Sequence, residues 1–279
     1  MFLTSYNVMI DLFNSYKLML QVLNSFTIDQ LKVRIFQSSK EIGEAAAEFV
    51  ELELKAAIQQ KGFANLILGT GASQFSFLEA LKGKQIEWDK ITVFHLDEYI
   101  GISDEHPASF RKYLKERILD FVKPGKVHLI NGDAENLEEM LNEYESLLAS
   151  HPIDIACIGI GENGHIVFND PLVADFNDPR LIKVVELDEA CRKQQLGEGW
   201  FPNFDDVPKL AVSLTITAIM KCKAVSCVVP DERKSTAVRN ALFSEISTAC
   251  PASVLRKHPN TVLFLDLPAS TKIRNLIDF

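Results

Sequence analysis

The sequence is poor in cysteine and has no long apolar run. Five cysteines occur among 279 residues, and no Cys-x-x-Cys pair is present. An odd number of scattered cysteines excludes the disulfide framework of a small secreted protein and offers no zinc ligands at the usual spacing. No apolar run approaches the ~20 residues that cross a bilayer. We therefore expect reduced, buried thiols in a cytoplasmic protein that does not bind membranes.

Positive charge is in the minority. The chain has 38 acidic and 29 basic residues, and its formal net charge is −9. A general nucleic-acid or anionic-membrane binder needs a basic face, so we expect neither partner. A small anionic ligand is compatible with this charge, because a few cations and backbone amides can hold one phosphate. The 47% hydrophobic and 24% charged composition is typical of a globular protein.

The first 31 residues lack arginine and an unbroken apolar core, so neither a signal peptide nor a transit peptide is expected. Their apolar side chains instead follow helical spacing and predict an N-terminal helical extension over residues 1–31. The stripe consists of Met9, Leu12, Phe13, Tyr16, Met19, Leu20 and Leu23. We favour packing of this helix on the domain surface; contact with a second subunit of a homo-oligomer is the alternative.

From residue 32 to residue 279, short apolar runs alternate with helical patterns. Ser38 and Glu41 form a capping box before a helix that ends near Lys61. The predicted strands are 32–36, 64–68, 91–96, 126–130, 153–160, 182–187, 209–215, 224–230 and 260–265. Further helices are predicted after residue 73, from Ser109, over 134–150, and near Asp188, Ile216, Lys234 and Pro268. Strands that are apolar on both faces and separated by helices predict one α/β domain, a Rossmann-like three-layer sandwich with a mostly parallel sheet and helices on both faces.

Three loops follow predicted strands, where open α/β sheets bind their ligands. The first is Gly69-Thr70-Gly71-Ala72-Ser73, a glycine-rich turn before a helix. Free amides at such a point bind phosphate, although the turn matches neither a P-loop nor a full dinucleotide motif. A plain tight turn is the alternative.

The second loop begins with adjacent carboxylates, Asp97 and Glu98. Neighbouring side chains of a strand point to opposite faces, so we expect one of them to face the cleft. A helix-capping aspartate beside a solvated glutamate is the alternative. The third loop runs from Gly159 to Pro171 after the most apolar strand and carries His165. Its glycines permit a contorted path, and histidine is the side chain best suited to move protons near neutral pH. The alternative is a structural histidine.

These segments carry a resemblance. "LGTGAS", "FHLDEYIGISDEHPASF" and "GIGENGHIVFNDP" are similar to motifs of the glucosamine-6-phosphate deaminase (isomerase) family, which shares its fold with 6-phosphogluconolactonases. The likeness runs from about residue 32 to about residue 261. It implies conversion of D-glucosamine 6-phosphate and water to D-fructose 6-phosphate and ammonia in amino-sugar metabolism, with no cofactor and no metal.

The resemblance also implies roles by position. Asp97 would move a proton between C2 and C1, and His165 would open the sugar ring. Asn163 and Asp170 would support the histidine. The residues implied in substrate binding are Gly69, Thr70, Gly71, Ala72, Ser73, Glu98, Gly164, Arg192 and Lys234. Lys234 matches the phosphate-binding lysine of the family, and Arg192 is the best candidate for its phosphate-binding arginine.

Two departures bear on the histidine. The family usually has aspartate where this chain has Asn163, and glutamate where it has Asp170. Asparagine can orient the ring but carries no charge, and Glu162 is a candidate to supply that charge. The serines of the family's allosteric site are absent from "NDPLVADF", so regulation by N-acetylglucosamine 6-phosphate is not expected.

Three alternatives are open. One is a deaminase for another hexosamine 6-phosphate, such as the galactosamine epimer. Another is a 6-phosphogluconolactonase, which Tyr99, Asn163 and Ile166 disfavour because that family typically has arginine, aspartate and threonine there. The last is a phosphosugar-binding protein without catalysis.

Overall fold

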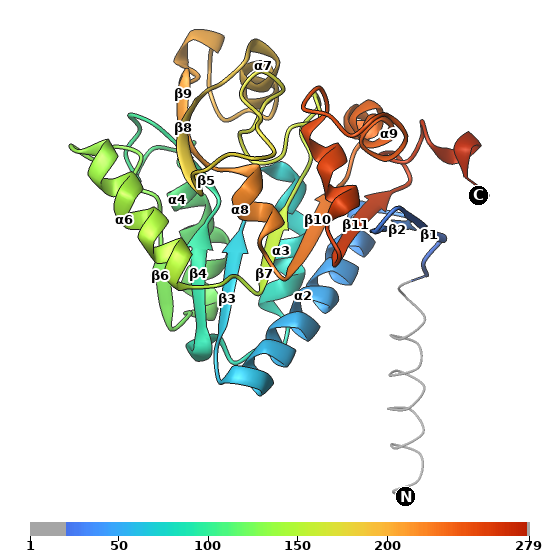
Figure 1. Cartoon of the computed structure of the whole chain (residues 1–279), viewed down its shortest axis with the longest axis horizontal. Helices are drawn as coiled ribbons and strands as arrows, with labels where there is room; N and C mark the ends of the chain where they lie inside the picture. The colour runs from blue at the N-terminus through green and yellow to red at the C-terminus, as the bar shows by residue number, and fades with distance from the viewer. Residues whose placement is uncertain (1–20, 278–279) are drawn as a thin grey trace, which may run out of the picture.

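The computed structural model describes residues 21–277. Its central sheet has eight strands in the order β1-β2-β11-β10-β7-β3-β4-β6, and every pairing is parallel except that of β1 with β2 (Figure 1). The strands are β1 Asn24–Ile28, β2 Leu31–Phe36, β3 Ala64–Leu68, β4 Ile91–His95, β6 Lys126–His128, β7 Ile155–Ile158, β10 Ala224–Val229 and β11 Thr261–Asp266. The predicted three-layer α/β sandwich with a mostly parallel sheet is confirmed.

Helices cover both faces of this sheet. The helices are α2 Ser39–Lys61, α3 Phe75–Lys82, α4 Phe110–Leu114, α5 Asp120–Val122, α6 Leu137–Ser150, α7 Glu189–Gly197, α8 Ile216–Met220 and α9 Ser235–Phe243. Strand alternation divides the core: Leu66 and Leu68 of β3 pack with α2 and α3, whereas Ile67 packs with α6, α8 and α9. Because β3 is buried on both sides, its residues are apolar except Asn65.

Helix α2 begins at the predicted cap. Ser38 Oγ accepts a hydrogen bond from Glu41 N at 3.3 Å, as expected. The Glu41 carboxylate, however, accepts from Gln37 N at 3.0 Å, and no bond from Ser38 N to it is found among the described residues. Gly62 ends the helix in the left-handed region, with φ 84°.

The N-terminal extension is only partly described. Residues 24–28, which the sequence assigned to a helical extension, form strand β1 and pair antiparallel with β2 at the edge of the sheet. Alternation of exposed and half-buried side chains in β1 suits an edge strand. The predicted apolar stripe from Met9 to Leu20 lies outside the described residues, and Leu23 lies in a bend before β1.

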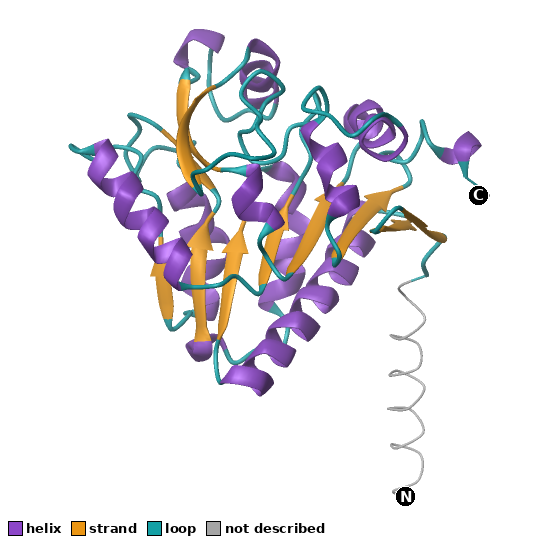
Figure 2. Ribbon diagram, in the orientation of Figure 1, coloured by secondary structure: helices purple, strands orange, loops and turns teal. Residues whose placement is uncertain are grey.

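A second, three-stranded antiparallel sheet was not predicted. It contains β5 Asp97–Tyr99, β9 Leu210–Leu214 and β8 Ile182–Glu186 in that order. Elsewhere in the chain, 3-10 turns cover residues 72–74, 88–90, 204–206, 232–234, 251–257 and 274–276. Figure 2 shows this small sheet, with α7 beside it, beyond the carboxyl ends of the parallel strands. Of this sheet, Asp97 of β5 lines the cavity described below, at the edge of the parallel sheet where ligands of α/β folds bind.

The helix predicted near Pro268 is wrong: hydrogen-bonded turns run from residue 267 to residue 273 and lead to a short 3-10 turn, Arg274–Leu276. Within residues 21–277, no helix is both long and apolar enough to cross a bilayer.

Candidate active site

A cavity of about 570 Å³ lies at the carboxyl ends of the parallel strands. Each of five strands sends the loop that follows it to the wall. The loops contribute residues 69–73 after β3, 96–97 after β4, 159–161 after β7, 230–234 after β10 and Pro268 after β11, and Asp266, the last residue of β11, joins them. Phe168 and the residues near α7 close the opposite side. The sequence predicted this location from the loops alone.

The glycine-rich turn forms one end of the cavity. Gly71 has φ 89°, a conformation that an L side chain rarely adopts, and the hydroxyl of Tyr113 donates to its carbonyl at 2.8 Å. All five residues of the turn, Gly69 to Ser73, line the cavity. The turn leads through a 3-10 turn at Ala72–Gln74 into α3, and the first amides of a helix have no acceptor within the helix itself.

Asp97 is the carboxylate that faces the cavity. It is 6% exposed, and Oδ1 has no hydrogen-bond partner among the described residues. Burial raises the pKa of Asp97 well above its ordinary value, the neighbouring charge of Glu98 raises it further, and a hydrogen bond with Thr70 opposes both. A carboxylate with raised proton affinity in a nearly dry site is suited to accept a proton from carbon.

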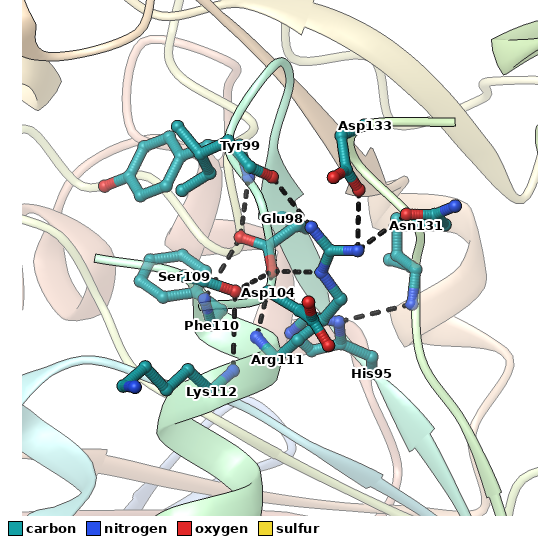
Figure 3. Close-up of polar contacts among 12 residues, drawn as sticks. His95, Glu98, Tyr99, Asp104, Ser109, Phe110, Arg111, Lys112, Asn131 and Asp133 are labelled. Carbon is teal, nitrogen blue, oxygen red and sulfur yellow. Dashed lines mark hydrogen bonds and ion pairs between the residues drawn. The ribbon is translucent and has the colours of Figure 1, made fainter. Parts of the chain in front are cut away.

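Glu98 points away from the cavity and does not line it, which contradicts its expected place in substrate binding. Its fully buried carboxylate caps the start of α4 (Figure 3). Oε1 accepts from Tyr99 N at 3.0 Å and Phe110 N at 3.1 Å, and Oε2 accepts from Ser109 Oγ and Arg111 N, both at 2.9 Å. The signal available in the sequence was strand alternation, which allows only one of two adjacent carboxylates to face the cleft.

Arg111 joins this capping carboxylate to two further loops. Its Nε lies 3.2 Å from Glu98 Oε2, and its Nη1 donates to Asn131 at 2.6 Å and Asp133 at 2.8 Å (Figure 3). Its Nη2 donates to the carbonyl of Ile102 at 2.7 Å. These contacts oppose the cost of burying the Glu98 charge, and the cluster holds β5, and with it Asp97, against the start of α4.

His165 lies in the wall of the same cavity, 7% exposed. Its Nδ1 is 2.8 Å from Oδ1 of Asp170, which is fully buried. Burial acts to raise the pKa of Asp170, but the contacts with His165 and Asn163 outweigh it, so the pKa is lowered from its ordinary value. Asp170 is consequently ionised at neutral pH and places a negative charge beside the ring of His165.

Asn163 serves the histidine indirectly. Its Nδ2 donates to Asp170 Oδ1 at 2.9 Å and to Asp188 Oδ2 at 3.1 Å, and its Oδ1 accepts from the backbone N of His165 at 3.0 Å. The expectation that Asn163 would orient the ring itself is wrong, since Asp170 contacts the ring. Glu162 does not supply the charge either, because its carboxylate lies 3.6 Å from Arg233.

Backbone strain marks this loop. Val167 adopts φ 57°, a region that a β-branched residue seldom enters, and Gly161 packs so closely on the His165 ring that a Cβ there would come within 2.2 Å of Cε1. Gly164, with φ 88°, packs against Cys250 and does not line the cavity, unlike its expected role in substrate binding. The glycines of the motif therefore shape the loop that presents His165.

Lys234 supplies a cation to the cavity. It is 5% exposed, and its Nζ makes no hydrogen bond or ion pair with another residue in the part of the chain that is described. Burial lowers the pKa of Lys234, while the carboxylates of Glu198 and Glu162 oppose this. Asp231, three residues earlier, is held at φ 84° by the carboxylate of Asp266, which accepts from its backbone N at 3.1 Å. A buried, unpaired ammonium group is suited to bind an anion.

Arg192 does not take the expected place beside phosphate. Its guanidinium donates to the carbonyls of Phe204 and Val207, at 2.9 Å each, and stacks on the Phe204 ring. It does not line the cavity. The same segment instead contributes Gln194, Gln195 and Glu198, which the sequence analysis missed, since helical periodicity alone did not show which face of α7 meets the cavity.

One group of side chains in the described residues brings three possible metal ligands together. Ligand atoms of His165, Asp170 and Cys191 lie within 4.8 Å of one another. Burial raises the pKa of the Cys191 thiol well above its ordinary value, and the charges of Asp170 and Asp188 add to this effect. A protonated thiol is a poor metal ligand, and Asp170 already accepts from Asn163, so the group is better suited to a hydrogen-bond network.

Comparison with known proteins agrees with this geometry. Residues 37–168 match the family model described as glucosamine-6-phosphate isomerases/6-phosphogluconolactonase. The chain is 33% identical over 239 residues to a glucosamine-6-phosphate deaminase of Bacillus cereus strain B4264, covering 86% of this chain and 88% of the relative. The corresponding protein of Bacillus cytotoxicus is equally similar, at 33% identity.

Solved structures extend the likeness to the whole fold. A structure described as a monomeric glucosamine-6-phosphate deaminase of the NagB superfamily superposes with a TM-score of 0.79 at 31% identity, covering 86% of this chain and 99% of that one. A 6-phosphogluconolactonase from Shewanella baltica superposes with a TM-score of 0.70 at 18% identity, covering 88% of this chain and all of the other. At that identity the second likeness concerns the fold alone.

Proposed function

The chain belongs to the family of glucosamine-6-phosphate isomerases and 6-phosphogluconolactonases and is an enzyme of the glucosamine-6-phosphate deaminase type, and from this premise we propose which of its residues carry out the reaction. The reaction converts D-glucosamine 6-phosphate and water to D-fructose 6-phosphate and ammonia. It requires ring opening, transfer of a proton from C2 to C1, and release of nitrogen from C2. Each step needs an acid or a base held at a fixed place beside the sugar.

His165 moves the proton that opens the ring. Its Nδ1 is held by Asp170, which leaves Nε2 to serve the ring oxygen of the sugar. Asp97 then removes the proton from C2 and delivers it to C1. The unpartnered Oδ1 of Asp97 is free to accept that proton, and burial favours the neutral acid that must donate it back.

The phosphate of the sugar rests in the part of the cavity that the Gly69–Ser73 turn and Lys234 line. The amides of the Gly69–Ser73 turn and the unpaired ammonium of Lys234 are the groups we assign to it. Binding the phosphate away from the reacting carbons orients C1 and C2 against Asp97. Glu98, Gly164 and Arg192 have no part in this binding, because each is engaged elsewhere.

The observation that carries the proposal is that Asp97 and His165, from loops 68 residues apart in the sequence, line one cavity with Lys234. The test measures ammonia and fructose 6-phosphate from the glucosamine, galactosamine and mannosamine 6-phosphates. Production of both from glucosamine 6-phosphate supports the proposal. Their absence with folded protein, or hydrolysis of 6-phosphogluconolactone well above background, contradicts it.

The cellular setting is part of the proposal. The five cysteines are all buried and free, which suits a reducing cytoplasm. The partner is a sugar phosphate and neither nucleic acid nor membrane. Whether residues 1–31 support a homo-oligomer is tested by light scattering of the full chain and of a chain that begins at residue 21. The similar deaminase of known structure is described as monomeric.

A further inference from the structure

Glu198 is an acidic residue at the phosphate end of the cavity. It follows α7, and its Oε2 lies 3.8 Å from the position a Cβ would take on Gly71. Oε1 accepts from Gln194 Nε2 at 2.9 Å, and Oε2 accepts from Trp200 Nε1 at 3.2 Å. The carboxylate makes no ion pair within the described residues, so it places a negative charge beside the turn assigned to phosphate.

Two cationic side chains, Arg233 and Lys234, lie near Glu198, and they differ in whether a carboxylate pairs with them. Arg233 is neutralised by Asp231, whose Oδ2 lies 3.0 Å from Nη2, and it also lies 3.6 Å from Glu162. Lys234 has no such partner, and the charge of Glu198 acts on it to favour the protonated form. An unpaired cation and an unpaired carboxylate therefore face the same end of the cavity, where a phosphate would meet both.

We infer that Glu198 is a binding-site residue that weakens the affinity for phosphate monoesters by electrostatic repulsion. The inference rests on the proposed function, because that function places phosphate at the turn. Repulsion of a dianion by a carboxylate several ångströms away in this partly solvated site is worth about 3- to 30-fold in affinity. Gln194 and Trp200 hold the carboxylate in place, so it does not swing clear of the ligand without breaking two hydrogen bonds.

The effect falls on binding and not on chemistry. The phosphate does not react, so the repulsion is the same in the ground state and the transition state. Such a uniform contribution changes KM and leaves kcat unaltered. Because substrate and product both carry the phosphate, the same repulsion favours release of fructose 6-phosphate.

The test compares Glu198→Gln with a matched control. Glutamine keeps the size of the side chain and removes its charge. Glu189→Gln removes one negative charge from the same helix at an exposed position where Glu189 pairs with Lys193. Titration calorimetry with inorganic phosphate and with glucose 6-phosphate gives Kd without turnover, and steady-state kinetics with glucosamine 6-phosphate gives KM and kcat.

For Glu198→Gln we expect Kd and KM to fall about 3- to 30-fold with kcat within about twofold of the original enzyme, and for Glu189→Gln we expect no change. Unchanged or raised Kd in Glu198→Gln, or an equal effect in the control, overturns the inference. If Glu198→Gln does not fold, Glu198→Ala must show the same decrease. Tighter phosphate binding without ammonia release would contradict the proposed function alone, and ammonia release with unchanged KM would contradict this inference alone.

Discussion

Nδ1 of His165 lies 2.8 Å from Oδ1 of Asp170, and Asn163 touches this carboxylate and not the ring. The charge that supports the histidine therefore comes from Asp170, with Asn163 as a neutral link to a second carboxylate, Asp188. The absence of aspartate at position 163 does not leave the imidazole without a charged partner. With asparagine at position 163, two carboxylates meet at this point, those of Asp170 and Asp188, in place of three.

The first prediction follows from this link. In Asn163→Asp a third carboxylate would face Asp170 and Asp188 in place of an amide that donates to both. Like charges this close raise one another's pKa values and destabilise the fold. We expect the variant's Tm near pH 8 to fall by about 4–8 °C, which is the shift for a loss of about 2 kcal/mol in unfolding free energy in a domain of this size. At pH 5 the fall in Tm should be smaller. A rise in both Tm and kcat would show that the position accepts the aspartate common in the family.

The second prediction concerns the cap of α4. Both oxygens of Glu98 accept from backbone N–H groups, so the amide of Glu98→Gln would set an N–H donor against other donors. The change also leaves Arg111 short of a buried negative partner, which costs about 3–5 kcal/mol. We expect Tm to fall by about 6 °C or more. Glu105→Gln, on the exposed surface nearby, serves as the control and should leave Tm unchanged.

The third prediction tests the anion site. Lys234→Ala removes the unpaired ammonium group, and a hydrogen bond between this cation and phosphate is worth about 1.5–3 kcal/mol. KM should rise about 10- to 150-fold while kcat changes little. Lys193→Ala, on the exposed side of α7, removes the same charge outside the cavity. A Lys234→Ala enzyme whose KM is unchanged would mean that this lysine does not contact phosphate.

The fourth prediction concerns stability and pH at Asp97. Its pKa is raised in the folded state above the unfolded value near 3.8, so the neutral acid is favoured by folding. The contribution to stability is present below the unfolded pKa and is lost as pH rises through the folded pKa. Asp97→Asn has no such loss, so its Tm should match the original enzyme at pH 4 and exceed it by at least about 2–4 °C at pH 8.

Asp104→Asn provides a control of opposite sign for this measurement. The hydrogen bond and charge of Lys115 lower the pKa of the exposed Asp104 carboxyl, so its contribution is present above the unfolded pKa and is lost in acid. Asp104→Asn should therefore gain nothing at pH 8. An equal gain in both variants would mean that burial of Asp97 is not the cause.

The sequence predicted the parallel sheet and the loops of the cavity because those features have local causes. Continuous apolar runs such as 155–158 arise from burial on both faces of the sheet. Glycine-rich turns that follow parallel strands meet at one edge of the sheet. Strand β5 was missed because its three residues are a strand only through pairing with Ala211–Ser213, more than 100 residues later. Nothing in the local pattern of 97–99 shows this partner.

Side-chain direction was the other limit. Arg192 lies within α7 and Glu198 directly after it, and tertiary packing decides which of them meets the cavity. The carbonyls of Phe204 and Val207 hold Arg192 on the far side, and those partners come from a loop whose path the sequence did not predict. The role of Asn163 was misjudged for the same reason, because Asp188 is 25 residues away.

The most direct test of the account is turnover by Asp97→Asn. The change is nearly isosteric and removes the base that we place at C2. We expect kcat for ammonia release from glucosamine 6-phosphate to fall about 10²- to 10⁴-fold. Calorimetric binding of glucose 6-phosphate should stay within about threefold, since the phosphate end of the cavity is untouched. Turnover within tenfold of the original enzyme would contradict the account and place the base on another residue.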